Sequence, residues 1–317
     1  MIKLFKTNIP LVFAFSVLFV SVAATTVFMD DTYGINSFFS WYVSILENIH
    51  QNEVLNYLLS VTLVITVGYF LNKAFNKTSF FQKSTGFPIF VYVTFLSTFN
   101  GVYFETALLI DLCFALAFLK LIDLDQNKSA INVAFVAGFL IGMAFLFSYW
   151  ILPLGFLIFF SLSTFRPFQW REWLVAIIGM GLPAIYLLSI KYLLFDKYTF
   201  KPIDLTQNTT ANNWADYIAF MILICIVILS VLKLLNQFKH ILNVERKQIN
   251  ILAFFTVLTF FVSAGIFWFY KIKFFVFVVP LTLLVCIPVL NSRHSRLINL
   301  LFSALIVLNL LRIFVFR

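Results

Sequence analysis

The sequence predicts an all-α integral membrane protein, a polytopic bundle of about eleven transmembrane helices with one interfacial amphipathic helix. Hydrophobic residues make up 62% of the 317 residues, charged residues make up 11%, and the mean hydropathy is +1.00. Apolar runs long enough to cross a hydrocarbon core of about 30 Å recur along the chain. This composition excludes a soluble protein. No long polar segment separates the runs, so residues 1–317 are expected to form a single transmembrane domain.

The net charge of +9 also has a membrane explanation. In a soluble protein it would suggest a nucleic-acid partner, but in a polytopic chain Lys and Arg collect in the cytoplasmic connections. Most of the 22 Lys and Arg residues fall in alternate connections, beginning with Lys3 and Lys6. We therefore expect a bacterial inner-membrane protein with its N-terminus in the cytoplasm, the C-terminal Arg317 outside, and no nucleic-acid partner.

The first span is expected at residues 9–29, after Lys3 and Lys6. Ser21-Val22-Ala23 resembles a signal-peptide cleavage site, but an uncleaved helix is favoured in a chain with so many further spans. Asp30 and Asp31 then stand at its outer end. In the outer loop at 30–53, apolar residues recur at helical spacing from residue 36 onward, opposite a polar face without Lys or Arg. This pattern predicts an amphipathic helix that lies in the interface without attraction to anionic lipid.

The stretch 88–120 consists of two apolar segments joined by Asn100-Gly101. The first, 88–99, is too short to cross about 30 Å at about 1.5 Å per residue. Either the helix borrows residues 100–103, or the turn lies below the outer surface and draws Glu105 inward. Asp111 falls midway along the second segment, 102–119. It is therefore expected near the bilayer midplane, where an acid is costly and marks a candidate functional site.

The remaining spans are taken from the apolar runs and are expected at residues 55–71, 130–147, 151–165, 173–194, 215–235, 249–270, 274–290 and 297–316. Ala134, Gly138 and Gly142 repeat at four-residue spacing, which predicts close packing against another helix. Pro183 predicts a kink in the span 173–194. Residues 195–214 form the second sizeable outer loop.

Candidate site residues gather on the outer side. Asp30, Asp31 and Glu105 could act as general bases or hold a divalent metal, and Lys271 and Lys273 could hold a phosphate. Each also has an ordinary structural explanation: the acids as solvated helix ends, the lysines as snorkelling side chains. For Asp111, a functional role and a structural hydrogen bond to a Tyr or Asn are equally open. The chain carries no Walker A, HExxH or GxSxG motif.

An acid after the first span, an interfacial helix in the first outer loop and an acid at the hairpin between the third and fourth spans resemble the membrane half of the GT-C glycosyltransferases. Residues 134–194 are also similar to the middle helices of that family. The resemblance implies that Asp30 or Asp31 is a catalytic or metal-binding carboxylate and that Glu105 is the second-loop acid. It also implies a polyprenyl-phosphate-linked sugar as donor. The chain as a whole resembles an uncharacterised flavobacterial family of polytopic membrane proteins, which supplies no function.

Three functions follow as hypotheses: a GT-C-like enzyme at the periplasmic face, a non-catalytic scaffold or assembly subunit of an envelope complex, and a transporter with Asp111 as its proton or ion site. For the enzyme, we expect Asp31 and Glu105 to face one another across an outward-opening groove, with the helix at 36–52 as its rim. Lys271 and Lys273 would then lie near the phosphate of the lipid-linked donor.

Overall fold

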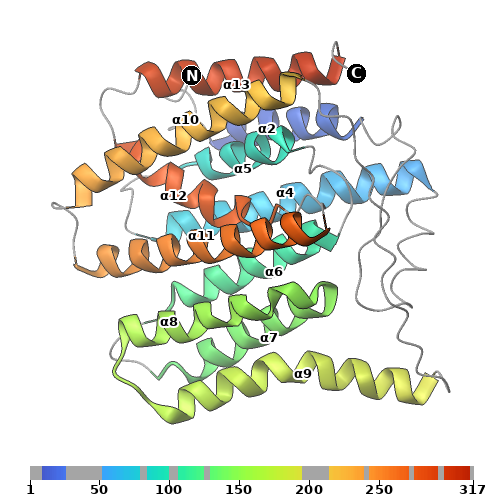
Figure 1. The fold of residues 1–317 in the computed structure, drawn as a ribbon, viewed down its shortest axis with the longest axis vertical. Helices are drawn as coiled ribbons and strands as arrows, with labels where there is room; N and C mark the ends of the chain where they lie inside the picture. The colour runs from blue at the N-terminus through green and yellow to red at the C-terminus, as the bar shows by residue number, and fades with distance from the viewer. Residues whose placement is uncertain are drawn as a thin grey trace.

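The computed structural model describes residues 9–25, 52–78, 84–99, 106–124, 129–194, 214–238, 243–270, 275–291 and 296–314. Within these ranges the protein is all-helical, as predicted, and its eleven α-helices take the places of the eleven expected spans (Figure 1). The helices are α2 Ile9–Ala24, α4 Glu53–Lys77, α5 Phe87–Thr98, α6 Thr106–Leu121, α7 Ile131–Phe147, α8 Phe156–Phe165, α9 Trp170–Leu194, α10 Trp214–Gln237, α11 Asn243–Tyr270, α12 Val278–Asn291 and α13 Arg296–Phe314.

The lengths and composition of these helices mark the chain as a membrane protein. Four helices, α4, α9, α10 and α11, are long and apolar enough to cross a bilayer. Shorter apolar helices complete the bundle, and many large hydrophobic side chains lie exposed on its outside, among them Leu18, Ile185, Met221 and Leu300. An exposed apolar surface of this extent suits hydrocarbon as the surrounding solvent.

Helix α5 is the centre of the larger part of the bundle. All twelve of its residues are buried, and it contacts α2, α4, α10, α12 and α13 (Figure 1). A helix that is hydrophobic all round belongs in such a position. The helix ends at Thr98, with Phe99 as its C-cap, and residues 100–103 lie outside the described residues. Because neighbouring helices cover α5 on every side, its length need not match the thickness of the hydrocarbon core.

Helices α7 and α9 make the most extensive contact of any two described helices, and the predicted stripe of small residues explains it. A Cβ built on Gly138 would lie 2.5 Å from the carbonyl oxygen of Ala176, and one on Gly142 would meet the carbonyl of Met180. From the other side, a Cβ on Gly179 would lie 2.6 Å from the carbonyl oxygen of Phe135. The two backbones therefore touch along a seam where neither helix has room for a side chain, which confirms the close packing.

Several of the expected boundaries were wrong. Helix α4 continues to Lys77, six residues past its expected end at 71, and α12 begins at Val278, four residues after its expected start at 274. The span expected at 151–165 begins with a 3₁₀ segment, Tyr149–Gly155, and becomes α-helical only at Phe156. Pro153 lies inside that segment and has no N–H to give to an α-helical hydrogen bond. Helix α11 begins at Asn243, six residues before its expected start at 249, with Glu245 in a favourable first-turn position. Pro183 lies inside α9, and the kink expected there stays a prediction.

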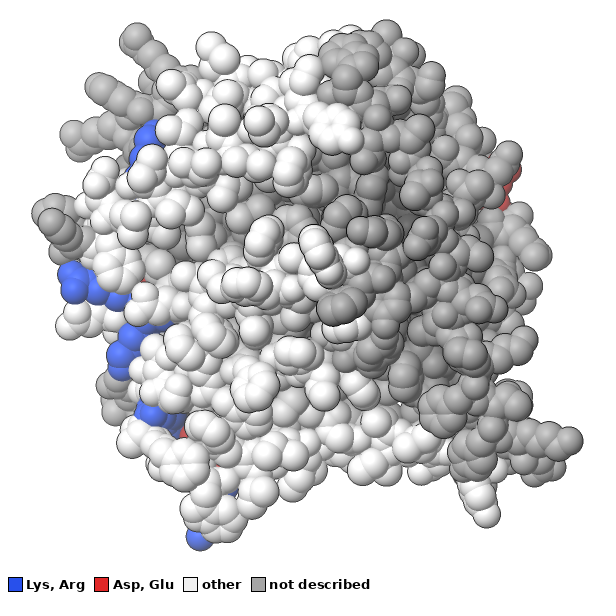
Figure 2. Space-filling view, in the orientation of Figure 1, with Lys and Arg blue, Asp and Glu red and all other residues white. Residues whose placement is uncertain are grey.

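Among the described residues, most basic side chains lie at one end of the bundle. Figure 2 shows Lys and Arg along the left edge, where α9 and α11 begin. Lys247 lies over the ring of Phe165, 5.9 Å from its centroid, so the start of α11 and the end of α8 meet at this end. Arg166, which is half-buried, and the buried Glu172 form an ion pair there, at 2.6 Å. The predicted topology assigns this end to the cytoplasm, and that assignment stays a prediction.

Candidate functional site

Most of the predicted site residues lie outside the described residues. These are Asp30, Asp31, Glu105, Lys271 and Lys273. The interfacial helix expected at 36–52 also lies outside, except for Asn52, whose side chain accepts a hydrogen bond from the N–H of Leu55 and caps α4. The groove expected between Asp31 and Glu105 therefore stays a prediction.

Asp111 is the one predicted site residue that lies within the described ranges. It sits on α6 with 1% of its surface exposed, and its Oδ2 accepts a 2.9 Å hydrogen bond from the hydroxyl of Tyr92 on α5. Its Oδ1 has no partner among the described residues. A hydrogen bond from a Tyr is what the structural explanation of Asp111 requires. This bond joins α5 to α6, the next helix in the chain. Asp111 does not line the groove described next.

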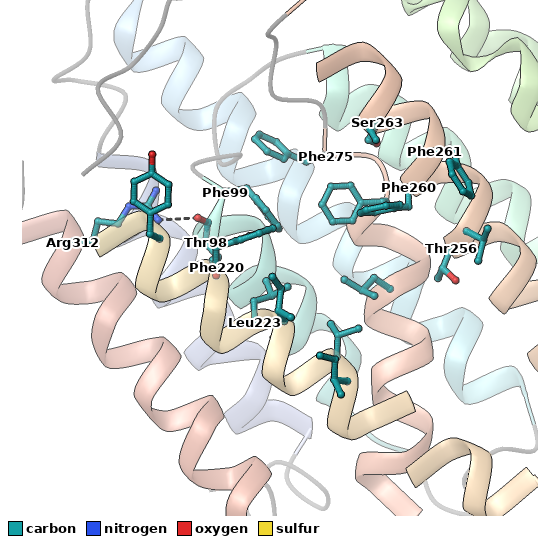
Figure 3. A pocket seen from close by; sticks show the side chains of 18 residues that line it. Thr98, Phe99, Phe220, Leu223, Thr256, Phe260, Phe261, Ser263, Phe275 and Arg312 are labelled. Atoms are coloured by element: carbon teal, nitrogen blue, oxygen red, sulfur yellow. Dashed lines mark hydrogen bonds between the residues drawn. The ribbon is translucent and has the colours of Figure 1, made fainter. Parts of the chain in front are cut away.

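A groove that the sequence did not reveal lies between α10 and α11 (Figure 3). It encloses about 740 Å³, and its base is formed by the end of α5 and the start of α12. Aliphatic side chains of α10 line one wall, and aromatic rings line much of the rest: Phe99, Phe220, Phe260, Phe261, Phe275 and Phe277. The ring of Phe99 packs on Phe275, with 5.0 Å between centroids. We call this cavity the lateral groove.

The lateral groove opens on the outside of the bundle. Tyr217, Val257 and Phe261 on its rim are exposed, whereas Leu223 and Phe275 at its base are buried. Its lining residues on α10 run from Tyr217 to Ile228, about 16 Å at about 1.5 Å per residue. In a bilayer the opening would therefore face lipid over about half the thickness of a ~30 Å hydrocarbon core.

Arg312 stands at one end of the lateral groove. Its Nη1 donates a 2.8 Å hydrogen bond to the carbonyl oxygen of Thr98, in the last turn of α5 (Figure 3). One turn earlier on α13, Asn309 donates to the carbonyl of Thr94 and to Oγ1 of Thr98, both at 3.2 Å. The last carbonyls of a helix lack intrahelical donors and attract cations. Helix α13 thus supplies donors to the end of α5 and fixes the guanidinium beside the groove.

Ser263 is a second polar residue on the groove wall, on α11. It is buried, and its Oγ has no hydrogen-bond partner among the described residues. Two threonines of the same helix behave differently: Thr256 donates to the carbonyl of Ala253 and Thr259 to that of Phe255, each at 2.7 Å. Ser263 therefore differs from both threonines, of which Thr259 is buried and Thr256 half-buried.

Sequence reasoning had a signal for Arg312 and did not use it. An arginine three residues after an asparagine, inside an otherwise apolar span, is costly in hydrocarbon and marks a candidate site. Arg312 lies near the outer end of the last expected span, 297–316, where a snorkelling side chain is the ordinary explanation. The groove itself has no such signal, because its walls come from helices far apart in the sequence.

The described residues hold no group of three or more His, Cys, Asp or Glu side chains able to bind a metal ion. Cys113, Cys225 and Cys286 are free thiols within α6, α10 and α12. The predicted metal-binding acids lie outside the described ranges, so a divalent metal stays a prediction.

Comparison with known proteins identifies a family but no activity. Residues 34–316 match DUF6427, which is described as a family of unknown function. No curated protein and no solved structure matches the chain. The function therefore has to be argued from the lateral groove and from the residues around it.

Proposed function

Because the chain belongs to DUF6427, a family of unknown function, we propose its function from the lateral groove: the protein binds a lipid-linked substrate drawn sideways from the bilayer. The activity we propose is that of a GT-C-like glycosyltransferase whose donor is a sugar on a polyprenyl phosphate. The observation that carries the proposal is an apolar groove, open on the outside of the bundle, with an arginine at one end.

The lining of the groove supports a substrate with a long hydrocarbon chain. Its volume, about 740 Å³, falls in the range of small-molecule sites, roughly 300–1,000 Å³. Its walls offer aromatic and aliphatic surface and few hydrogen-bonding groups. A water-soluble substrate would lose its hydration there without replacement. A lipid chain loses nothing, because it exchanges one apolar surrounding for another and gains packing.

The position of the groove supports a link to the predicted catalytic acids. Thr98, in the groove wall, precedes Glu105 by seven residues, which span at most about 25 Å of chain. The groove lies at the ends of α5 and α13 where each helix finishes, and the predicted topology places those ends on the outer side. Asp30 and Asp31 are predicted on that same side, as the resemblance to the GT-C enzymes requires.

Transfer assays separate this function from the two alternatives. The enzyme should lose transfer of sugar from a polyprenyl phosphate on Asp31→Asn and keep it on Asp111→Asn. If instead Asp111→Asn abolishes uptake of a solute and Asp31→Asn leaves it intact, the protein is a transporter that uses Asp111. If the protein tolerates both changes and purifies with constant partner proteins, it is a scaffold.

The groove has its own test in the binding of farnesyl phosphate, a short lipid phosphate, to the protein in a neutral detergent. Val227→Trp fills the groove from α10 and should weaken binding at least about tenfold, a loss of about 1.4 kcal/mol. Leu232→Trp, on the exposed face of the same helix outside the groove, is the matched control and should leave binding unchanged. Equal binding by the wild-type protein, Val227→Trp and Leu232→Trp would contradict the proposal.

A further inference from the structure

We propose that Ser263 is a binding residue of the lateral groove, whose hydroxyl donates a hydrogen bond to the oxygen atom that joins the head of the bound lipid to its hydrocarbon chain. The inference rests on the proposed lipid-binding function and adds the residue that fixes the position of the lipid along the groove. It starts from the hydrogen bonds of the buried hydroxyl groups.

Ser263 carries the only buried hydroxyl without a hydrogen-bond partner in the part of the chain that the structure describes. A serine or threonine inside a helix ordinarily donates to the carbonyl of the residue three or four positions earlier. Ser161 on α8 and Ser230 on α10 are buried and do so, each at 2.7 Å. Ser263 is also buried, with 5% of its surface exposed, but its Oγ bonds to neither such carbonyl of α11. A buried donor in this state indicates a partner from outside the protein.

The position of Ser263 places this partner inside the groove. Ser263 belongs to the lining, and Figure 3 draws it on α11 among the side chains around the cavity. Phe260 lies one turn earlier on the same face of α11, and its ring packs against that of Phe277 with 6.2 Å between centroids. A water molecule needs about two to four polar partners to stay in a cavity, more than a serine beside aromatic rings supplies. A ligand atom therefore suits Ser263 better than water.

The surroundings of Ser263 favour an uncharged oxygen as the ligand atom. One hydroxyl donates one hydrogen bond, and the neighbouring rings donate none. A charged phosphate enclosed among these rings would lose its hydration without replacement. The oxygen that links a prenyl chain to its phosphate carries little charge and needs a single donor. Because Ser263 and Ala264 are the last lining residues of α11, the phosphate itself would lie beyond this wall of the groove.

The other end of the same wall suits the hydrocarbon chain. Thr256 and Val257 are the first lining residues of α11, and Thr256 precedes Ser263 by about 10 Å at about 1.5 Å per residue. The hydroxyl of Thr256 already donates to the carbonyl of Ala253 at 2.7 Å, so it requires nothing from a ligand. A lipid whose linking oxygen lies at Ser263 would therefore extend its chain along Phe260 toward Thr256.

The experiment compares three probes that share one hydrocarbon chain, each bound to the full chain in a neutral detergent. Farnesyl phosphate and farnesol carry the linking oxygen, and farnesene lacks it. Ser263→Ala should weaken binding of the first two probes by a similar factor, about fivefold or more, and leave binding of farnesene unchanged. Ser230→Ala is the matched control. It removes a buried serine hydroxyl that α10 itself satisfies, outside the lining, and should change the binding of none of the three probes.

The stability of the ligand-free protein provides a second measurement. Ser263→Ala removes a hydroxyl that has no partner, whereas Ser230→Ala removes a hydrogen bond that is formed. The midpoint of thermal unfolding should therefore be higher for Ser263→Ala than for Ser230→Ala, and at least as high as for the wild-type protein. A midpoint for Ser263→Ala below that of Ser230→Ala would assign Ser263 a structural role and overturn the inference.

Three binding results would also overturn the inference. Unchanged binding of farnesyl phosphate and farnesol by Ser263→Ala, while Val227→Trp still weakens binding, would remove Ser263 from the site but leave the proposed lipid binding intact. A loss confined to farnesyl phosphate would make the phosphate, and not the linking oxygen, the partner of Ser263. An equal loss of all three probes would mean that Ser263 only shapes the groove. Failure of the wild-type protein to bind any of the probes would instead contradict the proposed function itself.

Discussion

At the scale of single residues, the hydroxyl of Tyr92 is the only described partner of the Asp111 carboxyl, and both side chains are buried between α5 and α6. Tyr92→Phe should therefore lower the free energy of unfolding by about 1–3 kcal/mol, because it leaves Oδ2 without a donor. Asp111→Asn should cost less, because an amide oxygen can still accept from Tyr92. Thermal unfolding in detergent measures both. A cost for Asp111→Asn equal to or above that of Tyr92→Phe would show that the carboxyl has another essential partner.

Glu172 is a second buried acid, with 2% of its surface exposed. Its Oε1 accepts from Arg166 Nη1 at 2.6 Å and from the N–H of Ala130, the residue before α7, at 3.0 Å. Glu172→Ala should lower the free energy of unfolding by about 3 kcal/mol or more, because it leaves the largely buried charge of Arg166 without a counter-charge. The double variant Arg166→Met/Glu172→Leu should recover much of that loss in the same unfolding assay. If the double variant loses as much stability as the two single variants together, this explanation is contradicted.

At the scale of elements, two glycines on α9 form a matched pair. A Cβ on Gly179 would lie 2.6 Å from a backbone oxygen of α7, whereas one on Gly181 meets nothing within 4 Å. Gly179→Ala should destabilise the protein by about 1–3 kcal/mol, since helix backbones must move apart to admit the methyl group. Gly181→Ala should be neutral or stabilising by up to about 1 kcal/mol, because alanine favours the helix. The midpoints of thermal unfolding test the pair, and similar midpoints for the two variants would argue against a rigid α7–α9 seam.

At the scale of the whole molecule, the sequence predicts eleven crossings in alternate directions, which would place the two termini on opposite sides of the membrane. A fluorescent protein that matures only in the cytoplasm should therefore be active on Met1 and dark on Arg317. A periplasmic phosphatase reporter should give the reverse. If both reporters place the termini on one side, the helix to suspect is α5, because it is the shortest of the helices on the inside of the bundle and is wholly enclosed by protein.

The sequence by itself determined the membrane class, the number and order of the helices, and the close packing of α7 through Ala134, Gly138 and Gly142. These properties are local: hydropathy marks a span, and small residues at four-residue spacing mark a packing face whatever lies opposite. The sequence also predicts the enclosed α5 as an apolar segment, and its short length indicates that it is not an ordinary span.

Only the tertiary structure decided which helix faces are covered by protein and which are open. In a membrane chain every face of a helix is apolar, so periodicity cannot separate surfaces that pack on other helices from surfaces that meet lipid. The burial of α5, the groove between α10 and α11, and the hydrogen bond from Arg312 to Thr98, 214 residues away in the sequence, all depend on which helices become neighbours. That choice is made by packing between segments distant in the chain, and no single segment of the sequence contains it.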